Sequence, residues 1–580
     1  MRNVEPTQRQ TNMDSPPRGR KLGIGFGICL AVVCLCLAGT GTVAAQSADI
    51  IVASDGTEDY TSIQNAINNA NTGDRIRISQ GTYSESIDIR KNVDIVAPDG
   101  ATISPSSNAV SAVALAGGTE SHLVNLTIEG ESSIGLDARS STGDWTAENI
   151  HITGFRFGVT TLESTGDWVI SDSEIKNSNA RGIATERSSG NWTIKSSSIR
   201  NVSGIGIDAH DVDAGLIKDT VIEDITQSYE YDGQGINIDD TSGNWVIENV
   251  TVRDTGYDGI DAGDTNATHD PVIRNTKVIG AAEEGIDIAG SESDVLITGS
   301  TVRDTGPGEY NNAIRIEDAQ GDWIIQDTVI QNISGEGIDG YTQPKSSHAT
   351  IRNLTINGTQ NVGINMYESD GDWTIADSVI ENTSNHGINA KRSNGELDID
   401  NLTVRNSDSD GIDASNTTGN ATVHASEFRN MGDKSIDLID SEGKWKIHES
   451  ILIGASEGAV EVQNANFRTN ASYNYWGTSD GPSGDFDGSG GSVVGDVTVT
   501  PYYVDSSLTT LSSEQDTGGK DTPTDPTQRA LQITGKSDPS KLTQNDVTAV
   551  ITRFNRGQSV NNISINQDDV TATITLFGRN

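Results

Sequence analysis

The 580-residue chain is poor in cysteine, in aromatic residues and in apolar residues generally. Its three cysteines, Cys29, Cys34 and Cys36, all lie in one uncharged stretch near the N-terminus, which excludes a disulfide framework for the rest of the chain. Apolar residues make up 33% of the sequence, whereas ordinary globular domains contain about 45–50%. This composition excludes one large globular core and favours a fold that buries little area per residue.

Positive charge is scarce as well. Lys and Arg number 39 against 83 Asp and Glu, which gives a formal net charge of −44. Nucleic acids and anionic membrane surfaces both attract basic faces, so the charge excludes them as partners of the folded part. Such acidity resembles that of proteins of the halophilic archaeal type, in which salt screens the repulsion between like charges.

An export signal is predicted at the N-terminus. Residues 22–45 carry no charge, follow Arg18, Arg20 and Lys21, and end in the small residues Val-Ala-Ala. This pattern is typical of a secretory signal peptide, here residues 1–45. An uncleaved anchor is the alternative, because 24 uncharged residues also suffice to span a bilayer. Either way, the remainder is expected to be extracellular or at the cell surface.

The sequence does contain a clear internal repeat. A Gly-Ile-Asp-like element recurs, most often every 24 residues, at Gly135, Gly158, Gly182, Gly206, Gly235, Gly259, Gly285, Gly337, Gly363, Gly387 and Gly411. Seven periods also hold a Gly-x-Trp element, and a third apolar-alternating run lies between the two elements, for example 378–383. Three short strands with no room for crossover helices predict a coil of parallel strands. The expected fold class is therefore all-β, a right-handed single-stranded parallel β-helix with three strands per turn, over residues 46–504.

The tryptophans of the repeat allow two interpretations. They could stack on sugar rings, or they could belong to the core. Trp168 and Ile170 share strand parity, and so do Trp323 and Ile325, which places the indoles inward. Other periods carry Ala349, Leu397 or Ala421 at the same offset. The core interpretation is therefore favoured.

An N-terminal cap is expected at residues 59–76, where Ile63, Ala66, Ile67 and Ala70 fall on one helical face. Thr61 with Gln64 predicts a capping box for this helix. The segment 52–100, with its Gly-Thr-Tyr-Ser-Glu stretch at 81–85, resembles the opening of pectin methylesterases and their non-catalytic relatives in the pectin-lyase-like superfamily. The catalytic motifs of the esterases are absent, so the resemblance implies the fold and no pectin methylesterase activity.

The repeat body resembles the carbohydrate-binding and sugar-hydrolysis type of β-helix, which implies polysaccharide as the partner. Residues 505–528 contain almost no apolar residue and predict a flexible linker. Residues 529–580 contain a duplication, 541–554 and 564–577, that resembles a dockerin-type module with two helices. Only Asp546 and Asp569 match the calcium ligands of that family, so this small all-α module is expected to attach to a surface protein with little or no calcium.

A column of outward side chains is predicted from the third position of the repeat, hereafter the Asp column. It comprises Asp137, Thr160, Ala184, Asp208, Asn237, Asp261, Asp287, Arg315, Asp339, Asn365, Asn389, Asp413, Asp437 and Glu461. Carboxylates on adjacent turns would stand about 5 Å apart, which calls for a cation, a shared proton or Arg315 to offset the repulsion. Asp261, Asp287, Arg315 and Asp339 are the candidate catalytic residues, with calcium a candidate on this acidic face.

Three longer periods around residues 226–234, 280–285 and 306–312 are expected to bring aromatic side chains to this region. The candidate substrate-binding residues are Tyr229, Tyr231, Tyr257 and Tyr310. Alternatively, the Asp column is a solvated acidic face that binds no ligand, because Asp and Asn suit the adjoining turn. The histidines show no metal-ligand spacing along the sequence.

Two functions follow from these features. In the first, a secreted or surface-held β-helix binds, and as a lyase or glycoside hydrolase cleaves, polysaccharide on the 230–340 face; Arg315 is the local base a lyase would need. In the second, the chain is a non-enzymatic surface, adhesion or scaffold protein displayed through its C-terminal module. Several Asn-x-Ser/Thr sequences, such as Asn201 and Asn249, allow glycosylation of such a surface.

Overall fold

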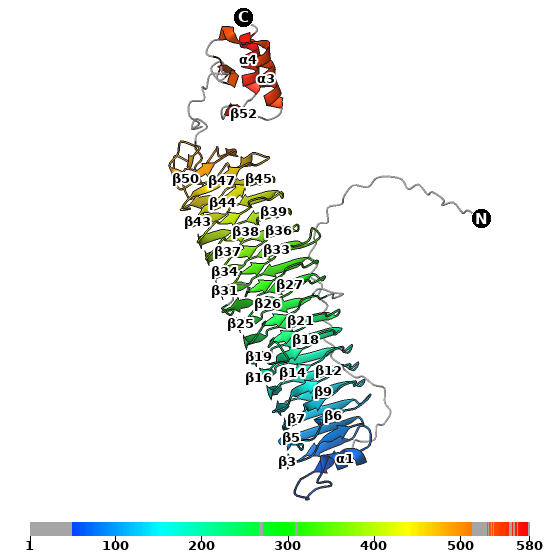
Figure 1. Ribbon diagram of the computed structural model, residues 1–580. Helices are drawn as coiled ribbons and strands as arrows, with labels where there is room; N and C mark the ends of the chain where they lie inside the picture. Colours follow the sequence, from blue (N-terminus) through cyan, green and yellow to red (C-terminus); the bar gives the residue numbers. More distant parts are fainter. Residues whose placement is uncertain are drawn as a thin grey trace, which may run out of the picture. The chain divides into compact units, whose positions relative to one another are not determined.

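The computed structural model describes residues 49–265, 271–307, 311–512 and most of 530–577. The predicted signal segment 1–45, Tyr310 and most of the predicted linker 505–528 lie outside the described residues. The described residues between 49 and 504 wind into a parallel β-helix, and the strands of successive turns stack into three sheets (Figure 1).

The first sheet contains the strands that begin with the repeat tryptophans. Its strands are β1 (Asp49–Val52), β2 (Arg75–Ile78), β5 (Val93–Ile103), β7 (Ser121–Glu129), β9 (Trp145–Glu148), β12 (Trp168–Ser171), β15 (Trp192–Lys195), β18 (Ala214–Lys218), β21 (Asn244–Glu248), β24 (Val272–Arg274), β27 (Val295–Thr298), β30 (Trp323–Gln326), β33 (His348–Arg352), β36 (Asp372–Ala376), β39 (Leu397–Asp400), β42 (Ala421–His424), β45 (Trp445–His448), β48 (Thr469–Asn470) and β51 (Val497–Thr498).

The second sheet follows the first after a tight corner, and β5 and β7 run through that corner into it. Its other strands are β3 (Thr82–Tyr83), β10 (His151–Thr153), β13 (Glu174–Ser178), β16 (Ser198–Ser203), β19 (Val221–Thr226), β22 (Thr251–Thr255), β25 (Lys277–Ala281), β28 (Thr301–Arg303), β31 (Val329–Ile333), β34 (Thr355–Thr359), β37 (Val379–Thr383), β40 (Thr403–Ser407), β43 (Glu427–Arg429) and β46 (Ile451–Ile453).

The third sheet is built from the Gly-Ile-Asp elements. Its strands are β4 (Ile87–Ile89), β6 (Ser111–Leu115), β8 (Ile134–Asp137), β11 (Phe157–Thr160), β14 (Arg181–Ala184), β17 (Ile205–Asp208), β20 (Ile236–Asn237), β23 (Ile260–Asp261), β26 (Ile286–Asp287), β29 (Ile314–Arg315), β32 (Ile338–Asp339), β35 (Ile364–Asn365), β38 (Ile388–Asn389), β41 (Ile412–Asp413), β44 (Lys434–Ile439), β47 (Gly458–Gln463), β49 (Pro482–Gly484) and β50 (Gly490–Val494).

Equivalent residues of successive turns lie opposite each other in all three sheets. In the first sheet Trp168 pairs with Trp192, and in the third Ile260 pairs with Ile286. All of these strand pairs are parallel, which confirms the predicted coil of three strands per turn. The core is a continuous stack of inward Ile, Val, Leu and Trp side chains that runs along the β-helix.

The repeat tryptophans belong to this core. Trp145, Trp168 and Trp192 are each at most 2% exposed. Their rings stack, with centroids 5.4 Å and 5.8 Å apart. Such burial leaves no face for a sugar, so the core interpretation is confirmed.

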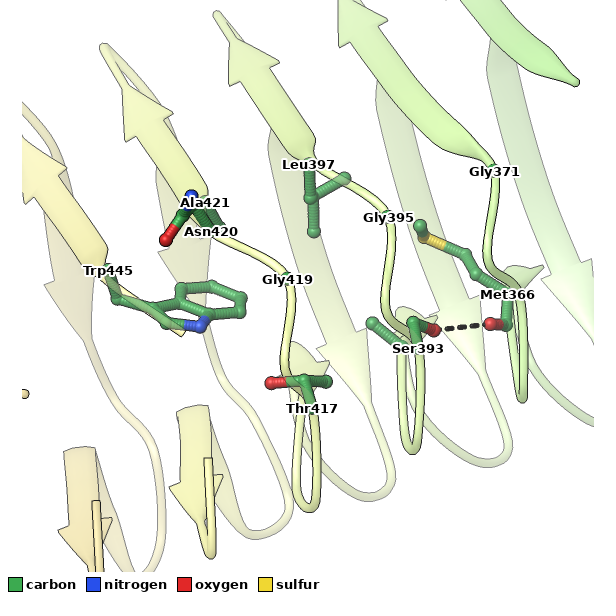
Figure 2. Close-up of a pocket in the computed structure, with 11 residues that line it drawn as sticks. Met366, Gly371, Ser393, Gly395, Leu397, Thr417, Gly419, Asn420, Ala421 and Trp445 are labelled. Atoms are coloured by element: carbon green, nitrogen blue, oxygen red, sulfur yellow. Dashed lines mark hydrogen bonds between the residues drawn. The ribbon is translucent and has the colours of Figure 1, made fainter. Parts of the chain in front are cut away.

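Where the sequence replaces Trp by a smaller residue, the packing leaves a small cavity. Figure 2 shows this place, where Leu397 and Ala421 stand in the Trp positions next to Trp445. The cavity has a volume of about 10 Å³ and Met366 also lines it. A cavity of this size holds one water at most, so it is a packing defect of the core and not a ligand site.

Stacked amides lie near the ends of the second-sheet strands. Asn201, Asn382 and Asn406 adopt the left-handed conformation that Asn tolerates best among non-glycine residues. The side chain of Asn406 donates to Asn382 at 3.1 Å, and that of Asn201 donates to Asn177 at 2.6 Å. These bonds join the amide side chains of successive turns into a stack.

The N-terminal end of the β-helix is covered by α1 (Ile63–Asn69), whose Ile63, Ala66 and Ile67 are buried. The predicted capping box of Thr61 and Gln64 is wrong, because the helix begins one residue later, with Ser62 as its N-cap. Glu85 completes the cap by accepting hydrogen bonds from the Ile63 and Gln64 amides at 2.7 Å and 3.1 Å. The Gly-Thr-Tyr-Ser-Glu stretch is thus a structural device that binds the cap to the first turns.

The C-terminal module contains η1 (Pro539–Lys541), α3 (Gln544–Asn555), α4 (Gln567–Phe577) and a small hairpin of β52 (Ser559–Val560) and β53 (Ile563–Ser564). Val550 of α3 and Val570 of α4 share one buried cluster. Asp546 accepts hydrogen bonds from the Thr543 amide at 2.8 Å and hydroxyl at 2.7 Å, so it caps α3. No helix within the described ranges is long and apolar enough to cross a membrane.

Candidate functional site

The Asp column exists as predicted. Strand register places Asn237 opposite Asp261, Asp261 opposite Asp287, Asp287 opposite Arg315, and Arg315 opposite Asp339. The inward isoleucines of the same strands are fully buried. The column side chains therefore project from the outer surface of the third sheet on consecutive turns.

Most members of the Asp column also have a structural role. The side-chain oxygen of each accepts the backbone N–H two residues later, as Asp261 does from Gly263 at 3.3 Å and Asp287 from Ala289 at 2.9 Å. The same bond recurs at Asp137, Asn237, Asp339, Asn365, Asn389, Asp413 and Asp437. Asn serves this turn as well as Asp, so the bond explains the column but not the choice of a charged residue at any one turn.

Four carboxyl groups gather at the turns of β23 and β26; they are Asp258, Asp261, Glu284 and Asp287, hereafter the acid set. One carboxylate oxygen each of Asp258, Asp261 and Asp287 lies within 4.8 Å of the other two. Asp258 is only 2% exposed and accepts the Glu284 amide at 2.9 Å. Asp258 and Glu284 each immediately precede a repeat glycine, so the repeat itself places both beside the column.

Burial and mutual repulsion keep protons on the acid set. Burial, followed by the hydrogen bond and charge of Glu284, raises the pKa of Asp258 to about 10. Burial, followed by the charges of Asp287 and Asp239, raises the pKa of Asp261 to about 7. Glu284 also has a raised pKa, mainly because it is buried. At neutral pH Asp258 is therefore protonated, and Asp261 exchanges between its protonated and ionised forms.

Arg315 stands between the acid set and Asp339. Its guanidinium donates to Asp287 at 3.0 Å and to Glu317 at 3.2 Å. Burial raises the pKa of Asp287, and the charge of Arg315 opposes that rise. Burial alone would lower the pKa of Arg315, but the charges of Asp287 and Glu317 outweigh it and hold the pKa above its usual value. Arg315 is thus a fixed cation that favours the ionised form of Asp287.

Asp339 belongs to a separate group beyond Arg315. Its carboxylate accepts hydrogen bonds from Asn312 at 3.1 Å and Asn365 at 3.2 Å. Burial, followed by the charge of Asp339, raises the pKa of the neighbouring Glu336 to about 9. The four predicted catalytic residues therefore share one face, with Asp261 and Asp287 together and Asp339 on the other side of Arg315.

The long 226–234 loop does not bring its tyrosines to the acid set as the sequence analysis expected. Tyr231 covers Arg181, whose guanidinium carbon lies 4.7 Å from the ring centroid, and Glu230 pairs with Arg156. The loop thus bends back over earlier turns, because basic partners are available there. Tyr229 is fully exposed. Tyr257 is half-buried, and burial followed by the charge of Glu283 raises its pKa.

A different tyrosine pair lies near the acid set. Tyr341 and Tyr367 follow Asp339 and Asn365 by two residues, and their rings stack with centroids 5.7 Å apart. The guanidinium of Arg392 lies 5.4 Å from the Tyr367 centroid. The signal for this pair was present in the sequence, since two tyrosines occur at the same repeat offset in consecutive turns.

Two histidines join acidic clusters that the sequence spacing did not reveal. His210 lies 2.9 Å from Asp208, and His386 lies 3.1 Å from Asp410. Each cluster already contains a cation of the chain: Arg181 lies 2.6 Å from Asp208, and Lys391 lies 2.7 Å from Asp413. These clusters are ion-pair networks in which a metal ion would have to displace an existing positive charge.

Comparison with protein families identifies one match, described as "Right handed beta helix region", over residues 111–267, 234–404 and 312–475. These ranges cover more than half of the chain, so the protein belongs to the right-handed β-helix family. The family also gives the hand of the coil, as the sequence analysis predicted. A search of curated proteins finds no match.

Similar solved structures include three polysaccharide-acting proteins. The A-module of the mannuronan C-5 epimerase AlgE4 of Azotobacter vinelandii is 11% identical, covering 71% of this chain and 94% of that one with a TM-score of 0.27. The GH87 α-1,3-glucanase of Streptomyces thermodiastaticus is 13% identical, covering 81% and 72% with a TM-score of 0.26. Pectate lyase Pel9A is 12% identical, covering 73% and 79% with a TM-score of 0.21.

Proposed function

We propose that the protein binds polysaccharide along the third sheet and hydrolyses it with Asp261 and Asp287. The observation that carries this proposal is a pair of adjacent carboxyl groups in unlike environments. Asp261, with a pKa raised to about 7, retains a proton near neutral pH, whereas Arg315 donates to Asp287 at 3.0 Å and favours its ionised form. Glycoside hydrolysis needs one carboxylic acid and one carboxylate flanking the scissile bond.

The separation of the two groups supports a double displacement. Retaining glycosidases place their carboxyl groups about 5–5.5 Å apart, and inverting enzymes about 6.5–9.5 Å apart. Oxygens of Asp261 and Asp287 lie within 4.8 Å of each other, which is closer to the retaining separation than to the inverting one. Asp261 would protonate the leaving oxygen while Asp287 bonds to the anomeric carbon. Asp261 would then deprotonate the water that releases the sugar with retained configuration.

A lyase mechanism has less support at this site. A lyase requires a base that abstracts a proton next to a uronate and cations that neutralise its carboxylate. Arg315, the candidate base, is held in its charged form by Asp287 and Glu317. The surrounding acid set would also repel a uronate, so hydrolysis of a glycan without acidic groups fits better.

Aromatic side chains next to the site support a polymeric substrate. Tyr341 and Tyr367 lie on the same face, one and two turns beyond Arg315. Sugar rings present apolar C–H faces that pack on aromatic side chains while their hydroxyls bond to polar neighbours. Tyr257, which directly precedes Asp258 of the acid set, remains a candidate contact at the edge of the site.

Calcium is the alternative occupant of the acid set. Asp258, Asp261 and Asp287 offer three carboxylate oxygens at mutual distances suited to a shared ion. Bound calcium would displace the protons that define the hydrolytic pair. Calcium that inhibits turnover, and that Asp258→Asn no longer binds, would favour this alternative.

Secretion through residues 1–45 and attachment through the 529–580 module complete the proposal. The decisive experiment is a reducing-sugar assay in high salt on a panel of polysaccharides, with the wild type, Asp261→Asn and Asp287→Asn. Loss of turnover in both variants supports the hydrolase. Binding of a polysaccharide without turnover, unchanged in both variants, would instead favour the non-enzymatic adhesion or scaffold function.

A further inference from the structure

A larger hollow opens elsewhere on the third sheet, at β4, β6 and β8. Its volume is about 530 Å³, within the range of about 300–1,000 Å³ that is typical of ligand sites. It is distinct from the acid set. Asp137, which lines the hollow, lies five turns from Asp261, or about 24 Å along the sheet.

The shape of this hollow follows from the repeat. Strand register places Ala114 between Asp88 and Asp137 on consecutive turns. Arg90, Ala116 and Arg139 follow these three by two residues. The turn of Ala114 and Ala116, which presents only methyl groups at these two positions, thus lies between two turns with the same Asp-x-Arg pattern. The two charged turns form walls about 9–10 Å apart, and the alanine turn forms the floor.

Each wall is an ion pair held in place within its own turn. Arg139 donates to Asp137 through Nε at 2.9 Å and through Nη2 at 2.8 Å. Arg90 contacts Asp88 through Nε at 2.7 Å and Nη2 at 2.6 Å. The side chains of Arg90 and Arg139 remain 75% and 43% exposed. Each wall therefore presents guanidinium donors and carboxylate acceptors with no net charge.

The floor is apolar where the walls are polar. Ala114, Leu115 and Leu162 line the hollow together with the two ion pairs. A pyranose ring has this same division, since its faces carry C–H groups and its rim carries hydroxyls that both donate and accept. A uronate has less to gain, because the guanidinium charges are already neutralised and Glu163 adds a further negative charge to the lining.

We infer that this hollow is a second, non-catalytic subsite that holds a neutral segment of the glycan chain. The inference rests on the proposed function, because it assigns the hollow to the same polymer. Both places lie on the outer surface of one sheet. A chain that reaches from the Arg90 and Arg139 walls to the acid set passes beside the 226–234 loop, which covers Arg181 between the two places. Arg90, Arg139 and the two alanines are then specificity-determining residues that act on affinity and leave the reacting atoms alone.

The test uses the full chain carrying Asp261→Asn, so that no substrate is consumed. Isothermal titration in high salt measures binding of neutral cello-, manno- and laminari-oligosaccharides and of oligouronates. At least one neutral oligosaccharide should bind, and Ala116→Trp, which fills the hollow, should abolish that binding. Arg139→Ala should weaken it by about tenfold, the loss expected for a charge-assisted hydrogen bond.

Arg253→Ala is the matched control, because Arg253 forms an exposed ion pair with Glu223 on the second sheet. It should bind like its parent. No binding by any neutral probe, binding unaffected by Ala116→Trp, or tighter binding of oligouronates would each overturn the inference.

The two proposals fail separately. In one outcome the wild type turns over a polysaccharide, and Ala116→Trp and Arg139→Ala leave its KM unchanged. This outcome would contradict the subsite and support the hydrolase. In the other outcome an oligosaccharide binds, Ala116→Trp abolishes that binding, and no polysaccharide is turned over. This outcome would support the glycan-binding subsite and contradict the hydrolase.

Discussion

Asp261 and Asp287 lie opposite each other on successive turns, and each also fixes its own turn by accepting the backbone N–H two residues later. The two roles can be separated by substitution. Asn keeps the turn bond and removes the ionisable group, because its side-chain oxygen accepts the same N–H. Asn therefore tests the chemistry of these residues without removing the turn.

Asp261→Asn is expected to lower kcat by about 10²–10⁴-fold, the usual contribution of a general acid, while the thermal midpoint stays within a few degrees of the wild type. Asp437→Asn is the matched control, since it removes a carboxylate from the same column with the same turn bond. It should retain full kcat. A wild-type kcat in Asp261→Asn would contradict the catalytic assignment.

Stability should fall as the pH rises through neutrality. The folded-state pKa values of Asp258 and Asp261, about 10 and about 7, lie above the value of about 3.9 for an unfolded Asp. Their contribution to stability is therefore complete below about pH 4 and is lost as the pH rises through the folded-state values. The thermal midpoint in high salt should decrease between about pH 5 and pH 8.

Asp258→Asn provides the comparison for this pH dependence. Asn carries no proton to lose, so the decrease should be shallower in the variant than in the wild type. Parallel curves for the two proteins would show that the pH dependence arises from other groups, such as His210, whose pKa its hydrogen bond with Asp208 raises.

Trp168→Ala should destabilise the β-helix by about 3–5 kcal/mol, the cost of emptying a large buried aromatic site. Trp168 is 1% exposed and stacks on the tryptophans of both neighbouring turns. The denaturant midpoint, followed by circular dichroism, measures this cost. Val169→Ala on the outer side of the same strand should cost about 0.5 kcal/mol or less, and equal losses in both variants would argue against the core role of the indoles.

Glu85→Ala should loosen α1 from the first turns. Removal of the carboxylate leaves the Ile63 and Gln64 amides without their partner, at a cost of about 1–3 kcal/mol. Hydrogen exchange at these two amides should accelerate while exchange in the central turns stays constant. Glu58→Ala, an exposed site near the same end, should leave both regions unchanged.

The sequence predicted the register of the fold because each turn carries its own Gly-Ile-Asp-like element. Alignment of these elements places Asp261 opposite Asp287, although the turn between them is longer than 24 residues, and strand parity places Trp168 inside. These features depend on local periodicity and parity, which a sequence displays directly.

The direction of the long loops could not be predicted in this way. Tyr231 turns back to Arg181 because a cation is available there, and no period encodes that choice. The acid set could be predicted only in part. The repeat predicts the Asp column, but how closely Asp258 and Glu284 approach that column depends on the geometry of the corner before the third sheet. The hollow at Ala114 and Ala116 was not predicted, because it forms where small alanine side chains replace the larger side chains of the neighbouring turns.

The amide stack at the corner has a consequence for how such a protein can change in length. Asn406 bonds to Asn382 through groups that any further corner amide can offer to the next, so the chain of bonds has no preferred number of members. If one complete turn were inserted or deleted, the turns on either side of the change would still pair with each other in register. The distance between the Arg90–Arg139 hollow and the Asp261–Asp287 pair can therefore change in evolution by whole turns of the β-helix. The residues that form each of the two places would stay the same.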